Sequence, residues 1–170
     1  MTRNTEARRG FTLIEILIVV AVIGSMMIWM IPSIMNSLET RNLDNSARQI
    51  QTTLQQARFR AINEKVDYRV RFAQVNGEWQ VLLECAGTGG TWTPATNFLT
   101  IYVSTKVILT LKLPSTQAVE YSSVGIVQGY DSTHNSLTLQ SLKLQGYHQQ
   151  DLRILTIFQG GSVRYQKSAS

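Results

Sequence analysis

The sequence predicts an α+β protein in which a long N-terminal α-helix packs on an antiparallel β-sheet domain, with the N-terminal half of the helix apolar enough to cross a membrane. Residues 11–35 are almost wholly apolar. From residue 43 to residue 61, apolar side chains recur at helical spacing, and from residue 66 onward they alternate with a period of two. We therefore expect one helix over about residues 11–64, followed by strands.

The apolar stretch 11–35 carries four clearly polar side chains, those of Thr12, Glu15, Ser25 and Ser33. About 20 apolar residues cross a hydrocarbon core, so this stretch is expected to be a transmembrane or filament-core helix. Arg8 and Arg9 just before it are expected to stay on the cytoplasmic side. Glu15 does not fit a plain anchor, because a carboxylate inside a membrane costs about 2.5–3.5 kcal/mol on insertion scales. It is expected to persist only where a cation meets it.

The segment Gly10-Phe11-Thr12-Leu13-Ile14-Glu15 resembles the processing site of type IV prepilins and of the pseudopilins of type II secretion. The resemblance implies that residues 1–10 are a leader, removed by prepilin peptidase between Gly10 and Phe11, and that the new N-terminus is methylated. It also implies that Glu15 pairs with the N-terminal amine of a neighbouring subunit during assembly. A buried carboxylate is tolerated in such a pair, and removing either partner is costly.

Two more positions follow from the same resemblance. Gly24 and Pro32 match places where the N-terminal helix of pilins loosens in filaments. Glycine weakens a helix through backbone entropy, and proline through a lost hydrogen bond. The resemblance implies as partners other pilin or pseudopilin subunits, prepilin peptidase, inner-membrane lipid and an assembly platform.

Three plainer interpretations of the N-terminus explain less of it. A secretory signal peptide would need a shorter apolar core and a small-residue cleavage site, which the residues after Ile31 do not offer. A twin-arginine export signal meets the same objections. A simple single-pass anchor explains the hydrophobicity, but not the Gly10–Phe11 junction followed by Glu15.

Residues 36–170 are expected to form the second half of the helix and a β-rich domain. The helical stripe consists of Leu43, Ala47, Ile50, Leu54, Ala57 and Ala61. The polar side chains expected on the opposite side are those of Arg41, Asp44, Arg48, Gln51, Gln55 and Arg58. A coiled-coil partner is the alternative for this stripe, but it covers under three heptads and is rich in alanine, so packing on a sheet is favoured.

The alternating pattern begins with Val66, Tyr68, Val70 and Phe72, and Asn76-Gly77 is a strong hairpin signal. The return strand places Trp79, Val81, Leu83 and Cys85 on one face, and residues 87–97 are expected to be a plain loop in which Trp92 is a candidate surface contact. Further strands are predicted over residues 98–103, 107–113, 118–122, 136–144, 152–158 and 162–166, with Gly160-Gly161 turning the closing hairpin.

Two segments narrow the resemblance to the GspH/FimT type of minor pseudopilin and minor pilin. Residues 57–62, Ala-Arg-Phe-Arg-Ala-Ile, resemble the end of the helix in that group, and the last hairpin, ILTIFQGGSVRYQ, resembles its final strands. Some FimT-like minor pilins use a basic patch in DNA uptake. By this resemblance Arg153, Arg164 and Lys167 are candidate DNA contacts, and the alternative is that they solvate an exposed face.

Composition adds little chemistry. Residues 1–10 hold three arginines and one glutamate, so the net charge from Phe11 onward is +3 rather than +5. Cys85 is the sole cysteine, which excludes an intrachain disulfide and favours core packing over a reactive role. His134 and His148 have no partners at metal-ligand spacing, Asp131 stands isolated, and no catalytic set is recognisable. No enzyme activity and no cofactor are expected.

The sequence thus predicts a minor pilin or pseudopilin, a structural subunit of a type II secretion pseudopilus or a type IV pilus. It is expected in a bacterial inner membrane with its globular domain on the periplasmic side, or in a filament or filament tip. The alternatives are a FimT-like DNA-binding minor pilin and a simple membrane-anchored extracytoplasmic domain.

Overall fold

The computed structural model describes residues 11–114, 117–141 and 151–168, without the side chains of residues 28–36. The leader 1–10, His148 and the end of the strand predicted over residues 136–144 lie outside the described residues. The chain forms two units, Met1–Leu38 and Glu39–Ser170, here called unit 1 and unit 2.

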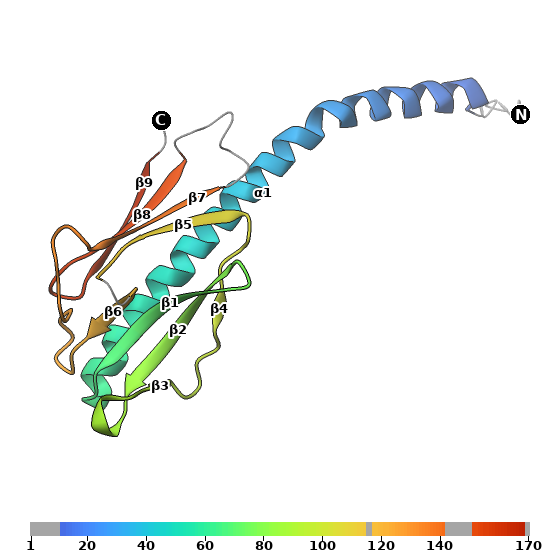
Figure 1. The fold of residues 1–170 in the computed structure, drawn as a ribbon. Helices are drawn as coiled ribbons and strands as arrows, with labels where there is room; N and C mark the ends of the chain where they lie inside the picture. The colour runs from blue at the N-terminus through green and yellow to red at the C-terminus, as the bar shows by residue number, and fades with distance from the viewer. Residues whose placement is uncertain (1–10, 115–116, 142–150, 169–170) are drawn as a thin grey trace, which may run out of the picture. The chain divides into compact units, whose positions relative to one another are not determined.

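Helix α1 runs from Leu13 to Glu64 and belongs to both units (Figure 1). Its bounds confirm the helix predicted over residues 11–64. In unit 1 the described apolar side chains from Phe11 to Met27 face outward; Leu13, for example, is 84% exposed. Within residues 13–27 and 37–64, where its side chains are described, α1 has no segment both long and apolar enough to cross a membrane.

Unit 2 contains two antiparallel sheets. The first has the order β3-β2-β1-β6, with β4 also paired to β2, and the second has the order β5-β7-β8-β9 (Figure 1). The strands of the first sheet are β1 (Tyr68–Val75), β2 (Glu78–Ala86), β3 (Trp92–Pro94), β4 (Ile101–Tyr102) and β6 (Ala118–Tyr121). Those of the second sheet are β5 (Val107–Lys112), β7 (Ser136–Ser141), β8 (Leu152–Ile157) and β9 (Val163–Ser168).

One hydrophobic core joins the helix to both sheets. All six members of the predicted stripe, Leu43, Ala47, Ile50, Leu54, Ala57 and Ala61, are fully buried. They share a cluster with Val70 and Phe72 of the first sheet and with Leu139 and Leu155 of the second. This shared cluster confirms that the stripe packs on a sheet. Alanine at half of its positions leaves room for the sheets to approach the helix closely.

The hairpin signals are also confirmed. Val75 pairs with Glu78, so Asn76 and Gly77 alone form the turn, with φ angles of 51° and 83°. Positive φ at both positions is typical of a type I′ turn. Gly161, with φ of 79°, lies in the turn between β8 and β9.

The loop predicted over residues 87–97 is wrong in part. It contains a short 3-10 turn, Thr88–Gly90, and strand β3, which pairs with the end of β2. The Trp92 ring lies 4.4 Å from the guanidinium carbon of Arg69, so this ring is engaged within its own chain. Cys85 is half-buried against the core, with its Sγ 3.3 Å from Thr93 Oγ1.

Two glycines in turns of the β-domain pack against the last turns of α1. Gly125 and Gly161 are buried and have positive φ. Arg58 donates a hydrogen bond of 3.1 Å from Nε to the carbonyl oxygen of Gly125, and a Cβ on Gly161 would meet both of these groups. Arg58 was expected on the solvent side of the helix, but it is half-buried because its side chain reaches across to these turns.

Candidate functional site

Thr12 and Glu15 form the start of α1 in unit 1. The Glu15 amide donates to Thr12 Oγ1 at 3.3 Å, and the Thr12 amide lies 3.5 Å from Glu15 Oε2. This reciprocal arrangement is a capping box, in which both side chains satisfy amides that the first helical turn leaves open. The spacing Thr-x-x-Glu is the sequence signal of a capping box.

Glu15 forms no ion pair with any of the residues that the structure describes. Its neighbours along the helix are outward-facing apolar side chains, such as Ile14 and Ile16, which are 66% and 53% exposed. Gly24 has open space beside it, because a Cβ there would meet nothing within 4 Å. The backbone at Pro32 is helical, but its side chain lies outside the described residues.

Arg153, a candidate DNA contact by resemblance, is buried beneath two partly exposed carboxylates. It is 0% exposed, and its guanidinium is held between the carboxylates of Asp44 on α1 and Asp151. Tyr165 on β9 donates a hydrogen bond of 2.9 Å to Asp44 Oδ1. These four residues, Asp44, Asp151, Arg153 and Tyr165, are called the Arg153 cluster below. Its burial removes Arg153 from a phosphate-binding surface.

The charges of the Arg153 cluster stabilise one another. Burial alone would raise the pKa of Asp44, but the hydrogen bonds from Arg153 and Tyr165 outweigh it and hold the pKa below the ordinary 3.8. Burial would likewise lower the pKa of Arg153, and its bonds to Asp151 and Asp44 raise it. Asp44 was expected on the solvent side of the helix. It is drawn toward the second sheet because a buried arginine must be paired.

Arg164 and Lys167 are exposed but point to opposite faces of β9. Side chains alternate along a strand, and the two positions differ by three residues. Lys167 is the cross-strand neighbour of Arg153, on the side of Asp44. Arg164 stands over the Phe158 ring, with 4.9 Å between its guanidinium carbon and the ring centre. The structure therefore does not bring these cations together on one face.

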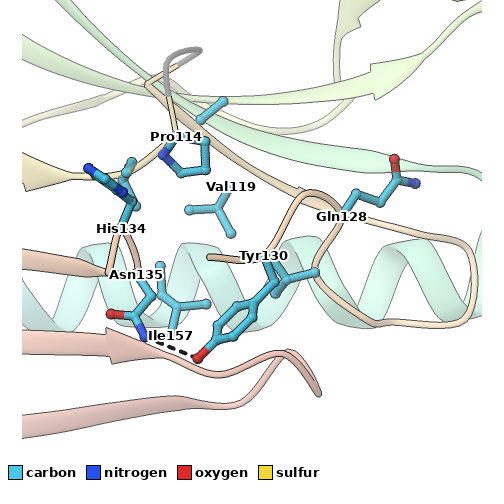
Figure 2. A pocket seen from close by; sticks show the side chains of 10 residues that line it. Pro114, Val119, Gln128, Tyr130, His134, Asn135 and Ile157 are labelled. Carbon is cyan, nitrogen blue, oxygen red and sulfur yellow. Dashed lines mark hydrogen bonds between the residues drawn. The ribbon is translucent and has the colours of Figure 1, made fainter. Parts of the chain in front are cut away.

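His134 and Asp131 form an exposed pair that sequence reasoning missed. His134 Nδ1 lies 2.6 Å from an Asp131 carboxylate oxygen. The Thr133 amide and the His134 ring lower the pKa of Asp131 to about 2. His134, Asn135 and Tyr130 also line a small pocket, in which Asn135 Nδ2 donates to Tyr130 Oη at 3.1 Å (Figure 2). The pocket encloses about 10 Å³, enough for at most one water molecule.

Metal chemistry finds no support in the described part of the chain. Within residues 11–114, 117–141 and 151–168, no group of three His, Cys, Asp or Glu side chains is placed to hold a metal ion.

Comparison with known proteins finds similarities for the N-terminus and for the fold. Residues 7–31 match the family described as the prokaryotic N-terminal methylation motif. Two solved structures of the minor pseudopilin EpsH from the type 2 secretion system of Vibrio cholerae resemble the chain, each with a TM-score of 0.59. One is 16% identical and covers 74% of this chain, the other is 15% identical and covers 77%, and in both cases 97% of the EpsH chain is matched. No curated protein sequence matches.

The chain therefore joins a prepilin-type N-terminus to the α+β fold seen in a minor pseudopilin.

Proposed function

We propose that the chain is a minor pilin or pseudopilin, a structural subunit of a type II secretion pseudopilus or a type IV pilus that is cleaved by prepilin peptidase after Gly10. The observation that carries this proposal is the match of residues 7–31 to the N-terminal methylation motif, on a chain with the fold of EpsH. The role is structural and needs no catalytic group or cofactor.

Unit 1 supports membrane insertion followed by assembly. Its outward-facing apolar side chains are unsuited to water and suited to lipid or to the same helices of other subunits. We infer that residues 11–35 anchor the subunit in the inner membrane, with the globular domain on the periplasmic side. The segment then moves into a filament or its tip complex.

Glu15 fits a register-setting role in that assembly. Within its own chain it has the Thr12 cap, and among the described residues it forms no ion pair. Cleavage ahead of Phe11 creates a free amine, and an ammonium of this kind on a neighbouring subunit would satisfy the carboxylate. Glu15 is the one charged residue between Phe11 and Leu38, so no cation of that stretch competes for it.

Glu15→Ala is expected to leave membrane insertion and cleavage intact and to impair assembly. Leaving one partner of a buried ion pair alone costs about 3–5 kcal/mol, roughly 100-fold or more in an equilibrium constant. The measurement is the fraction of processed subunit recovered in cross-linked complexes or filaments. Ser25→Ala is the matched control, because it removes another polar group from the same stretch, a hydroxyl that donates to the Val22 carbonyl oxygen of its own helix at 2.8 Å. Assembly of Glu15→Ala at the level of Ser25→Ala would contradict the pairing.

A second candidate function is DNA contact, favoured by the exposure of Arg164 and Lys167 on β9. Because the two side chains lie on opposite faces of β9, one DNA duplex can contact both of them only at the edge of this strand. Charged side chains on an edge strand also prevent unwanted strand pairing, and this explains both residues without DNA.

A gel-shift of the fragment 37–170 at several salt concentrations separates these interpretations. If β9 contacts phosphates, replacing both Arg164 and Lys167 by alanine should weaken binding and reduce the salt slope by about two. Lys106→Ala is the control, since Lys106 is an exposed cation in a loop away from β9. Absent or salt-insensitive binding by the unaltered fragment would remove DNA contact as a function.

A further inference from the structure

Two hollows adjoin along one flank of α1 in unit 2. The first encloses about 460 Å³ near the C-terminal end of the helix, and the second encloses about 320 Å³ beside its earlier turns. Gln56 lines both of them, and the two together are here called the Gln56 groove. Ligand pockets commonly enclose about 300–1,000 Å³, so each hollow has room for part of a ligand.

The walls of the Gln56 groove are α1 and the segment 96–101. Thr96 and Asn97 line the first hollow together with the helix, and Ile101 lines the second. Phe98 and Ile101 also pack against the hydrophobic core, which fixes this segment in place. The groove is therefore preformed, and a ligand that entered it would need little ordering of the protein.

Uncharged polar side chains dominate the lining of the groove. Exposed carboxamide and hydroxyl groups come from Asn45, Gln49, Thr52, Gln56, Asn63, Thr96 and Asn97. The charged lining residues are Arg48, Arg60 and Glu64. Arg60 donates a hydrogen bond of 2.9 Å to the Thr96 carbonyl, and Glu64 accepts one of 2.5 Å from the Tyr68 hydroxyl. The lining is suited to an uncharged ligand whose groups both donate and accept hydrogen bonds.

Phe59 adds one apolar surface to the first hollow. Its ring is 69% exposed, although an aromatic ring gains free energy when it is covered. A pyranose sugar has both properties that this lining matches. Its C–H bonds form an apolar face that covers an aromatic ring, and the hydroxyl groups around its edge donate and accept hydrogen bonds.

A peptide is the competing ligand, since its amides also donate and accept hydrogen bonds. Peptide recognition commonly adds a strand to a sheet edge or fills pockets for apolar side chains. Here the first hollow lies between a helix and residues 96–97, which form no strand, and Phe59 is the one apolar side chain among its described lining residues. These features favour a saccharide.

We propose that the Gln56 groove binds a linear, uncharged oligosaccharide, with one sugar ring stacked on Phe59 and further rings running along α1 toward Asn45. Two adjoining hollows suit a chain of sugars better than a single ring. This binding function goes beyond the structural role in a filament and does not rest on it, because all residues of the groove belong to unit 2.

Saturation-transfer NMR of the full chain in phosphatidylcholine nanodiscs tests the proposal, because the method detects weak binding to a large particle. The probes are tri-N-acetylchitotriose and maltotriose, two neutral trisaccharides of which only the first carries N-acetyl groups. At least one of them should receive saturation from the protein, and the signal should level off with sugar concentration. Stronger binding of the first probe would assign an N-acetylhexosamine glycan to the groove, and stronger binding of the second a plain glucan.

Phe59→Ala should weaken binding at least roughly fivefold, because the stacking surface is lost. Gln56→Ala removes the carboxamide that lines both hollows and should also weaken it. Both side chains are exposed, so both variants should stay folded. Leu99→Ala is the matched control, since Leu99 is an 88% exposed apolar side chain of the same wall segment that lines neither hollow.

Three results would overturn the proposal. The first is the absence of transfer to either sugar. The second is a loss of binding in Leu99→Ala as large as that in Phe59→Ala, which would indicate an unspecific apolar surface. The third is stronger binding of an uncharged, capped Ser/Gln pentapeptide than of both sugars, with the same sensitivity to Phe59→Ala, which would make the groove a peptide site.

Discussion

Gly161→Ala is expected to lower the free energy of unfolding of unit 2 by about 3 kcal/mol. The alanine must adopt a φ of 79°, a conformation that costs a residue with a Cβ about 1–2 kcal/mol. Its Cβ would also lie against the Gly125 carbonyl oxygen and 2.8 Å from Arg58 Nε, and overpacking of this kind costs about 1–3 kcal/mol more. Urea unfolding of the fragment 37–170, which contains all of unit 2, measures the loss.

Two other glycines of the chain supply matched controls. Gly129 has a φ of 58° but nothing within 4 Å of its Cβ position, so Gly129→Ala should show the conformational penalty alone. Gly160, next to Gly161, has neither a positive φ nor a close neighbour, so Gly160→Ala should be nearly neutral. A Gly161→Ala fragment no less stable than Gly129→Ala would disprove the close approach of the two turns and Arg58.

Gly10→Val is expected to block processing almost completely. The proposed cleavage site needs the backbone of Gly10 to approach the peptidase closely, and a branched side chain at that position obstructs it. A mass of 19.1 kDa for 170 residues puts the retained ten-residue leader at about 1.1 kDa, a shift visible on a denaturing gel and by intact mass. The unprocessed chain has no new amine at Phe11, so it should also fail to assemble.

Arg9→Lys is the control for that experiment, because it keeps the positive charge beside the junction and leaves Gly10 in place. It should be processed like the unaltered chain. Normal cleavage of Gly10→Val, or failure of both variants, would place the processing determinants elsewhere in the N-terminus.

Local patterns predicted most of the fold, because they depend on neighbours in the sequence. The stripe from Leu43 to Ala61 is buried as expected, since helical periodicity alone decides which side faces the sheets. Asn76-Gly77 forms the predicted turn because few other residue pairs adopt positive φ twice in succession. The capping box of Thr12 and Glu15 was equally readable from its spacing.

Contacts between residues far apart in the chain could not be predicted from local sequence patterns. Asp44 and Arg153 are 109 residues apart, and no local signal distinguishes a buried arginine on a strand from an exposed one. The pattern of β6 likewise shows a strand but not its partner, and this strand returns to β1 while its neighbours in the chain, β5 and β7, join the second sheet. For the same reason, the sequence could not show that Arg153 is buried while Arg164 and Lys167 are exposed, and DNA contact by these residues stays a prediction. The three residues share a hairpin, but only the tertiary structure decides which are buried.

The position of the mature N-terminus tests the central claim most directly. Intact-mass and N-terminal peptide analysis of the chain isolated from membranes should find a single species that begins at a methylated Phe11, with residues 1–10 absent. A chain that still begins at Met1, or one cut at any other bond, would contradict the proposed function.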